Sequence, residues 1–321
     1  MPKVLVIGGA GYIGSHVVKE LLDGGYETVV FDDMSTGQEV NLFHEAGFIK
    51  GNILDRKALD DAMSQNIDAV IHLAAKKAVG ESMANPQKYA INNLNGAVNI
   101  LNSMVDNGIK HLVFSSSAAV YGMPKYTPVD ENHPLNPINF YGYTKVAMEN
   151  LMDWYSRLKD FNYIALRYFN AVGYAADKSI TGREQNPQNL LPIIMEAATG
   201  KRESFSIFGS DYDTPDGTCV RDYIHVSDLA SAHVAAIKRL MADKKSYCLN
   251  LGTGKGVSVK QIVDATENVI GKRLNYHYAP RRAGDPATLI AKADSAREIL
   301  NWKPKYLNIE DVIRTVWNLE I

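Results

Sequence analysis

The sequence predicts an α/β fold: a doubly wound parallel sheet with a smaller, interleaved C-terminal lobe. Three observations lead to this fold class. Short apolar runs alternate with helical patterns, a glycine-rich turn follows the first apolar run, and acidic residues end the second. Uninterrupted apolar runs are typical of strands that are covered on both faces. A chain of 321 residues, 46% of them hydrophobic, is long enough to bury such a core.

The expected elements of the sheet follow in order along the chain. Strands are predicted at Val4–Ile7, Thr28–Phe31, Phe48–Ile49, Ala69–Leu73, His111–Phe114 and Tyr163–Leu166, with helices at Tyr12–Leu22, 86–107 and 140–158. Pro86 suits the first turn of the second helix. After Asn170 the rhythm loosens, and the polar, turn-forming residues of Thr181–Gln188 suggest a crossing into a different substructure.

The C-terminal part is expected to rejoin the main sheet. The elements predicted to return are a strand at Val220–Val226, a helix at Ser227–Leu240 and a strand at Tyr247–Leu251, and two more helices follow at 258–271 and 309–318. We therefore expect two interleaved lobes, one of residues 1–172 with about 220–255, the other of about 173–219 with 256–321.

Composition excludes several classes of function. The 34 Lys and Arg residues against 36 Asp and Glu residues give a formal charge of −2, so nothing favours nucleic-acid binding. No apolar stretch reaches the roughly 18 residues of a membrane span. Cys219 and Cys248 form no disulfide framework, which fits a cytoplasmic location. The closest histidines, His225 and His233, are too far apart for a His-x-x-x-His pair, so we expect structural histidines and no metal.

The glycine-rich turn is the strongest local motif. In Gly8-Gly9-Ala10-Gly11-Tyr12-Ile13-Gly14, glycines recur where a strand turns into a helix. Without Cβ atoms the backbone can approach a pyrophosphate closely, and the helix N-terminus offers N–H donors. A plain tight turn is the alternative, but Asp32 follows Gly14 by 18 residues, at the end of the next strand, as in a Rossmann-type dinucleotide site.

The acidic pair Asp32 and Asp33 indicates which dinucleotide is bound. Asp32 can accept hydrogen bonds from an adenosine ribose diol and would repel a 2′-phosphate. No Arg or Lys that could receive such a phosphate occurs from Phe31 to Asn41. The sequence therefore favours NAD over NADP, although Asp33 could equally be a solvated turn residue.

A Tyr-x-x-x-Lys motif supplies candidate chemistry. The pattern occurs four times, starting at Tyr121, Tyr141, Tyr155 and Tyr174, but only Tyr141 begins a predicted helix shortly after a strand that ends in three serines. Ligands of open α/β sheets gather at the carboxyl ends of strands. The Lys145 ammonium would favour the phenolate of Tyr141, whose ordinary pKa is about 10. A solvated Lys145 and a plain strand-end turn of serines are the alternatives.

These motifs together resemble those of the extended short-chain dehydrogenase/reductases, and within them the UDP-glucose 4-epimerase family. Further matching stretches are Gly11–His16, Lys77–Ser82, Phe114–Gly122, Leu166–Asn170, Gly217–Val226 and Pro280–Asp285. The resemblance covers nearly the whole chain. It implies a homodimer that interconverts UDP-glucose and UDP-galactose through a transient 4-keto sugar, with a tightly bound NAD that takes up the hydride and returns it.

The resemblance also implies roles for individual residues. Tyr141 would take the proton from the sugar 4-hydroxyl with help from Ser117, and Lys145 would hold the nicotinamide ribose. Cofactor-binding roles fall on Gly8, Gly11, Tyr12, Ile13, Gly14, Asp32, Asp33, Asn52, Ile53, Leu73, Ala74, Ala75, Lys77, Asn92, Ser115, Tyr141, Lys145 and Tyr168. Substrate-binding roles fall on Lys77, Ser117, Tyr141, Asn170, Asn189, Leu190, Phe208, Arg221, Arg282, Asp285 and Leu289.

Several alternatives stay open at this point. Related 4,6-dehydratases carry Thr-Asp-Glu where this chain has Ser117-Ala118-Ala119, and two alanines cannot transfer protons. A UDP-glucuronate decarboxylase would need a further cationic partner, and an NAD-sensing binding protein would not need the Tyr–Lys pair. In the family, a tyrosine at the position of Leu289 restricts the pocket to plain hexoses. Leucine there leaves epimerisation of UDP-N-acetylglucosamine possible.

Overall fold

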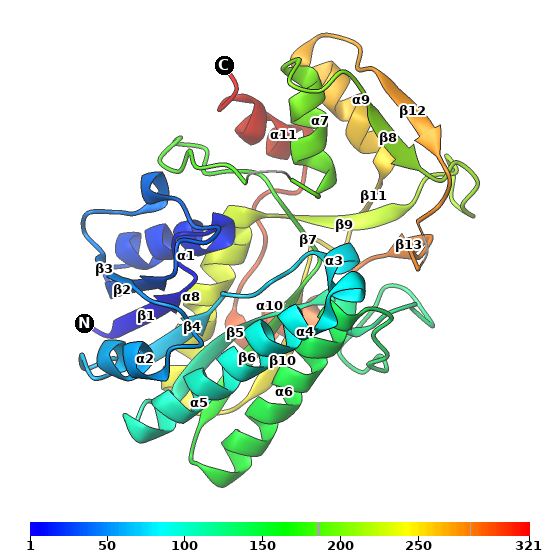
Figure 1. Cartoon of the computed structure of the whole chain (residues 1–321). Helices are drawn as coiled ribbons and strands as arrows, with labels where there is room; N and C mark the ends of the chain where they lie inside the picture. Colours follow the sequence, from blue (N-terminus) through cyan, green and yellow to red (C-terminus); the bar gives the residue numbers. More distant parts are fainter. Residues whose placement is uncertain (185–186, 283) are drawn as a thin grey trace.

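The largest element of the fold is a seven-stranded parallel sheet with helices on both faces (Figure 1). The computed structural model describes residues 1–184, 187–282 and 284–321. The strands of the main sheet lie in the order β10-β6-β5-β4-β1-β2-β3. Their bounds are β1 Lys3–Ile7, β2 Glu27–Asp32, β3 Gly47–Lys50, β4 Ala69–His72, β5 His111–Ser117, β6 Asn162–Tyr168 and β10 Tyr247–Leu251. The chain order reverses between β1 and β4, which confirms the predicted doubly wound fold.

Both faces of the sheet are buried by helices. Along β1, Val4 and Val6 point into one core, whereas Leu5 and Ile7 point into the other. The first core is closed by α1 (Tyr12–Asp23), α8 (Val226–Asp243) and α10 (Asp294–Leu300), and the second by α2 (Arg56–Met63), α5 (Gly96–Asp106) and α6 (Phe140–Leu158). Burial on both faces explains why the strands read as uninterrupted apolar runs.

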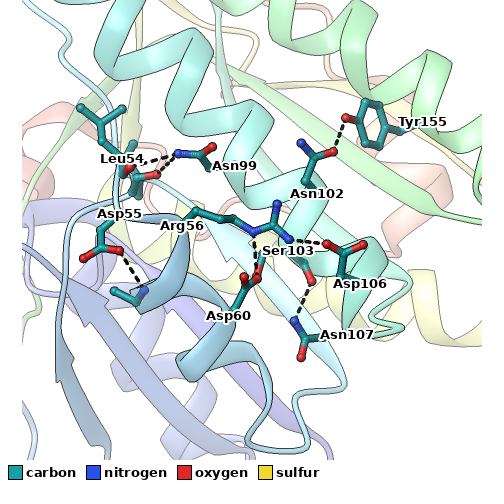
Figure 2. A network of polar contacts seen from close by, with 12 residues as sticks. Leu54, Asp55, Arg56, Asp60, Asn99, Asn102, Ser103, Asp106, Asn107 and Tyr155 are labelled. Atoms are coloured by element: carbon teal, nitrogen blue, oxygen red, sulfur yellow. Dashed lines mark hydrogen bonds and ion pairs between the residues drawn. The ribbon is translucent and has the colours of Figure 1, made fainter.

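A polar network fixes α5 between its two neighbours (Figure 2). Arg56 on α2 donates to Asp60 at 2.9 Å and pairs with Asp106 on α5, and Ser103 donates to Asp60 at 2.6 Å. On the other side, the Tyr155 hydroxyl on α6 donates to Asn102 at 2.6 Å. These bonds hold the three helices in register on one face of the sheet, so that α6 has a fixed position over β5.

The predicted helix at 86–107 is interrupted. After α3 (Val79–Ala84), the chain forms α4 (Pro86–Tyr89), a π-helical stretch (Ala90–Asn95) and then α5. The side chain of Asn93, which is fully buried in the π-helical stretch, accepts from the Lys76 N–H at 2.9 Å and donates to the Lys76 carbonyl at 3.0 Å. Such inserted turns are frequent at functional sites, and no periodicity in the sequence marks this one.

The smaller lobe has its own sheets and core. One sheet has the order β11-β9-β13, with β7 also pairing β9, and a second joins β12 to β8. The strands are β7 Asn170–Val172, β8 Phe205–Phe208, β9 Val220–His225, β11 Gly256–Ser258, β12 Tyr276–Ala279 and β13 Thr288–Leu289; the helices are α7 Leu190–Ala198, α9 Val259–Ile270 and α11 Ile309–Trp317. Helices α7, α9 and α11 pack around a shared apolar core at the top of Figure 1.

One part of the predicted topology is wrong. The strand expected at Val220–Val226 does not rejoin the main sheet, because β9 pairs with β7, β11 and β13 instead. The strand expected at Tyr247–Leu251 does join it, as β10 beside β6. Two residues of the predicted crossing at Thr181–Gln188, numbers 185 and 186, lie outside the described residues. Among the described residues, no helix is long and apolar enough to cross a membrane.

Candidate active site

The glycine turn between β1 and α1 is shaped to accept an anion. Gly8 has φ +88°, and a Cβ added there would lie 2.7 Å from the backbone nitrogen of Ala74; a Cβ on Gly14 would collide with the Gly8 carbonyl. Gly11 begins α1 without a side-chain cap, and the first turn contains no acidic residue. No acidic side chain within the first turn of α1 competes for its N–H groups, so the glycine turn fits the pyrophosphate of NAD.

The acidic end of β2 lies beside this turn. Asp32 is buried and accepts from the Ala10 N–H at 3.0 Å and the Met34 N–H at 2.9 Å. Burial raises the pKa of Asp32, and those two N–H donors oppose the shift. Asp33 accepts from the Asn52 amide at 2.8 Å, so two predicted cofactor residues meet across β2 and β3. The arrangement fits an adenosine ribose, and two carboxylates there would repel a 2′-phosphate.

Other predicted cofactor residues line the neighbouring strand ends. The N–H groups of Leu73 and Ala74, just after β4, both donate to the Ile7 carbonyl, which brings this segment against the glycine turn. Ala75 follows in the same segment, Ile53 lies buried after β3, and Asn92 donates to Asn93 at 3.0 Å within the π-helical stretch. Tyr12 and Ile13 open α1, and the Tyr12 hydroxyl donates to the Gly173 carbonyl at 2.5 Å.

The three predicted catalytic residues come together between β5 and α6. The Lys145 ammonium donates to the Ser115 carbonyl at 2.6 Å and lies 5.7 Å from the centre of the Tyr141 ring. Burial raises the pKa of Tyr141 to about 12, and a side-chain hydrogen bond with Ser117 opposes the shift. Burial also lowers the pKa of Lys145 to about 7, while the charge of Glu149 opposes that shift. The site therefore contains an acid–base pair whose charged forms depend on their immediate neighbours.

The start of α6 is fixed by polar residues around Tyr141. Asn139 caps the helix by accepting from the Gly142 N–H at 2.8 Å, and the Ser82 hydroxyl accepts from the Tyr141 N–H at 3.1 Å. Thr144 donates to the Tyr141 carbonyl at 2.7 Å. Ser82 lies in the matching stretch Lys77–Ser82, but the family resemblance implies no role for it. The only feature of the sequence that could have indicated this contact is the hydroxyl group of Ser82. In the structure, that hydroxyl donates to the Val79 carbonyl at 2.7 Å.

A second group of predicted residues meets in the smaller lobe. Arg221 on β9 forms an ion pair with Asp285 at 3.1 Å, and Leu289 on β13 is the register partner of Arg221. The Arg282 guanidinium stacks 4.0 Å from the centre of the Phe208 ring at the end of β8. Two guanidinium groups, one carboxylate and an aromatic ring are the groups needed to bind a nucleoside diphosphate.

The remaining predicted residues are placed separately. Lys77 forms an ion pair with Glu184 at 2.9 Å, and the Tyr168 hydroxyl donates to the Ser115 hydroxyl. Asn170 begins β7, and Asn189 and Leu190 stand at the start of α7. Within the described residues, no hydrogen bond or ion pair joins these last three side chains to Arg221, Arg282 or Asp285.

The glycine turn and the Tyr141–Lys145 pair share the carboxyl edge of one parallel sheet. Because that edge is where doubly wound sheets bind ligands, the fold and the site together define a dinucleotide-dependent enzyme of the short-chain dehydrogenase/reductase type. The model of the NAD dependent epimerase/dehydratase family matches residues 4–252. The chain belongs to this family.

Individual relatives agree with this assignment. The chain is 47% identical over 317 residues to UDP-glucose 4-epimerase from Lactobacillus helveticus, covering 98% of this chain and 96% of the relative. A UDP-glucose 4-epimerase from Brucella ovis in complex with NAD has a TM-score of 0.95 at 41% identity, over 98% of this chain and 97% of that one. A UDP-glucose-4-epimerase from Stenotrophomonas maltophila with bound NAD and formylated UDP-arabinopyranose has a TM-score of 0.96 at 40% identity. The match covers 100% of this chain and 98% of that one.

Proposed function

We propose that this protein is an NAD-dependent isomerase that interconverts UDP-glucose and UDP-galactose by epimerisation at C4 of the hexose. The observation that carries the proposal is the grouping of Ser117, Tyr141 and Lys145 at the sheet edge that also bears the glycine turn. Relatives and solved structures that match nearly the whole chain are UDP-glucose 4-epimerases, some of them bound to NAD and UDP-sugars.

The residues divide the work of the reaction. Tyr141, as phenolate, takes the proton from the sugar 4-hydroxyl and later returns it, with Ser117 hydrogen-bonded to it. Lys145 carries the positive charge that favours the phenolate. The glycine turn and Asp32 would hold NAD, which would supply the hydride acceptor and donor for C4 of the hexose. Arg221 and Arg282 hold the diphosphate, and Asp285 is available to the uridine ribose.

We assign these tasks to the two lobes that the sequence predicts. The main sheet binds NAD, and the smaller lobe binds the UDP-hexose. Support comes from the separation of the two predicted residue groups, because the glycine turn and Asp32 lie on β1, α1 and β2, whereas Arg221 and Leu289 lie on β9 and β13.

A direct assay tests the reaction. Purified protein mixed with UDP-galactose and no added cofactor should form UDP-glucose, because NAD is regenerated in each turnover. Tyr141→Phe should abolish the conversion and retain bound NAD. Tyr126→Phe is the matched control, because Tyr126 is 43% exposed and its hydroxyl donates to Asp130 outside the predicted site, and this variant should keep full activity. Wild-type protein that contains NAD but leaves UDP-galactose unchanged would refute the proposal.

Two rival reactions lack the groups they need. The turn after β5 carries Ala118 and Ala119, so it offers no acid or base for a 4,6-elimination. A decarboxylase would need a cation for the sugar carboxylate. The other cations among the predicted site residues have tasks in the proposed reaction, and Lys77 is already paired with Glu184. UDP-N-acetylglucosamine is a second substrate to consider, because Leu289 is smaller than tyrosine.

We further propose a homodimer formed through α6. Tyr143, Trp154 and Leu158 follow one another on the solvent side of this helix and are 50%, 59% and 68% exposed, and Ile91 of the adjacent π-helical stretch is 51% exposed. An apolar stripe of this kind suits a second copy of the same helix. Light scattering should give twice the monomer mass for the wild type and the monomer mass for Trp154→Glu; a monomeric wild type would refute the dimer.

We also expect the protein to work in the cytoplasm. Both cysteines of the described chain, Cys219 and Cys248, are free thiols, which suits a reducing compartment. Fractionation of cells that express the protein from its own gene tests this location, and recovery outside the cytoplasmic fraction would contradict it.

A further inference from the structure

A buried ion pair joins α6, the helix that carries Tyr141 and Lys145, to β6. Glu149 on α6 and Arg167 on β6 are 3% and 4% exposed, and two hydrogen bonds of 2.6 and 3.0 Å join the carboxylate to the guanidinium. None of the expected roles used either residue. Removing charges from water is costly, and a buried pair is weak evidence for stability alone, so its presence beside an active site calls for another explanation.

The position and contacts of Glu149 link it to the helix and the strand that carry the catalytic residues. It stands one helical turn beyond Lys145 and two turns beyond Tyr141, so the three side chains share one face of α6. Its carboxylate accepts from the Ser116 hydroxyl at 2.5 Å, and Ser116 lies between Ser115, which binds Lys145, and Ser117. Glu149 thereby ties the catalytic helix to the strand that carries the catalytic serine.

Arg167 extends the same network toward the substrate side. Its guanidinium donates to the Tyr121 hydroxyl at 3.1 Å, and that hydroxyl donates to Asn250 on β10 at 2.6 Å. The Asn250 amide donates to the Val129 carbonyl at 2.9 Å, and Val129 pairs with Ala291, two residues beyond Leu289. A continuous chain of hydrogen bonds thus runs from α6 to the segment that directly follows β13, the strand paired with Arg221.

We propose that Glu149, held in place by Arg167 and Ser116, is a positioning residue for the proposed reaction. It fixes β5 against α6, and its negative charge keeps Lys145 in the ammonium form. This inference rests on the proposed function for its catalytic meaning. The electrostatic part concerns the protein alone and can be measured without turnover.

The surroundings of Lys145 determine the sign of the expected effect. The titratable groups around Lys145 and Glu149 are Tyr141 on the same helix, His72 at the end of β4, Arg167 and Tyr168 on β6, and Cys248 on β10, whose thiol lies 3.9 Å from the Glu149 carboxylate. Only Glu149 supplies a negative charge that raises the pKa of Lys145 against the effect of burial. Arg167 neutralises that charge in part. Removing Glu149 should therefore lower the pKa of Lys145, and removing Arg167 should raise it.

The test measures the protonation of Lys145 directly. Protein labelled with ¹³C at the lysine Cε carbons is titrated by NMR, and the signal that is missing in Lys145→Met identifies this residue. We expect the pKa of Lys145 to fall by about one unit in Glu149→Gln, which leaves Arg167 unpaired, and to rise by about one unit in Arg167→Met. A purely structural pair would not give shifts of opposite sign.

Two further variants complete the design. Asp153→Asn removes a carboxylate two turns from Lys145 on the same helix, where it pairs with Arg157 near the surface, and should leave the pKa of Lys145 unchanged. The double variant Glu149→Gln with Arg167→Met contains neither charge, so it remains informative even if a single variant does not fold. Its Lys145 pKa should lie between those of the two single variants, and a value as far from wild type as either one would contradict the proposal.

The kinetics supply a separate readout. Glu149→Gln should lower kcat about tenfold with little change in KM for UDP-galactose, because the substrate contacts are intact. Shifts of the same sign in both single variants, or no larger than in Asp153→Asn, would overturn the positioning role. If wild type shows no epimerisation but the NMR shifts have opposite signs, the proposed function fails and the electrostatic coupling stands.

Discussion

Four buried histidines make the fold sensitive to mild acid. Burial lowers the pKa of His16 and His233 to about 4 and that of His72 and His225 to about 3, against 6.5 for an exposed imidazole. A group whose pKa is lowered by folding binds its proton first in the unfolded chain. The stability it contributes is therefore fully present above pH 6.5 and is lost as the pH falls toward 4.

The size of the loss follows from the shifts. Between pH 7 and 5.5, each such histidine costs about 1.2 kcal/mol of unfolding free energy, or about 5 kcal/mol for four, comparable with the total stability of many domains. Asp32, Asp222 and Asp228, whose pKa values burial raises, act in the opposite sense. The diagnostic quantity is therefore the difference between the wild type and a variant that lacks one of these histidines.

His72→Leu is the most informative variant. Neither ring nitrogen of His72 has a hydrogen-bond partner in the described chain, so an apolar replacement leaves no partner unpaired. Urea unfolding, followed by tryptophan fluorescence at saturating NAD, should show about 1.2 kcal/mol less destabilisation between pH 7 and 5.5 than in the wild type. His44→Gln, at a fully exposed position, should match the wild type. An equal pH dependence in His72→Leu and the wild type would refute the reasoning.

Three further predictions concern ligand binding. Gly14→Ala should lower NAD retention at least about tenfold, measured by absorbance after gel filtration, because its Cβ meets only backbone in the glycine turn; full retention would contradict the assigned turn. Arg221→Met should raise KM for UDP-galactose about 10- to 100-fold and change kcat little, whereas Arg281→Met, paired with Asp211 near the surface, should have no such effect. Wild type should turn over UDP-N-acetylglucosamine. Leu289→Tyr should reduce this rate about tenfold and leave the rate on UDP-galactose unchanged, because tyrosine is larger than leucine. A wild-type rate on UDP-N-acetylglucosamine below about one thousandth of that on UDP-glucose would contradict this second substrate.

The parallel sheet could be predicted from the sequence because all of its strands except the exposed edge strand β3 are covered on both faces. Val4–Ile7 and Tyr247–Leu251 are uninterrupted or nearly uninterrupted apolar runs, and both lie in the main sheet. Val220–His225 mixes charged and apolar residues, and its partners come from distant segments such as Gly256–Ser258. Nothing local to a strand specifies which partner it takes, so the sheet of β9 could not be predicted.

The candidate site was predictable where its chemistry is concentrated in short motifs. The glycine turn and the pair Tyr141 and Lys145 each occupy a single turn or helix, so spacing alone places their side chains. Asn93 and Arg167 act through partners that are distant along the chain, namely the Lys76 backbone and Glu149. Their roles depend on tertiary contacts, and the sequence shows neither that a polar residue is buried nor which partner it bonds.

The repeated passage of the chain between its sheets limits how the molecule can be dissected. After β6 the chain enters the smaller lobe through β7, returns to the main sheet as β10, and leaves again through β11. A fragment that ends after Val172 would lack β10, α8 and α10, leaving the β6 edge unpaired and one apolar face of the sheet covered by α1 alone. Exposed edges and faces of this kind promote aggregation. The lobe built on the main sheet is thus contiguous in space but not in sequence, and no single truncation isolates it.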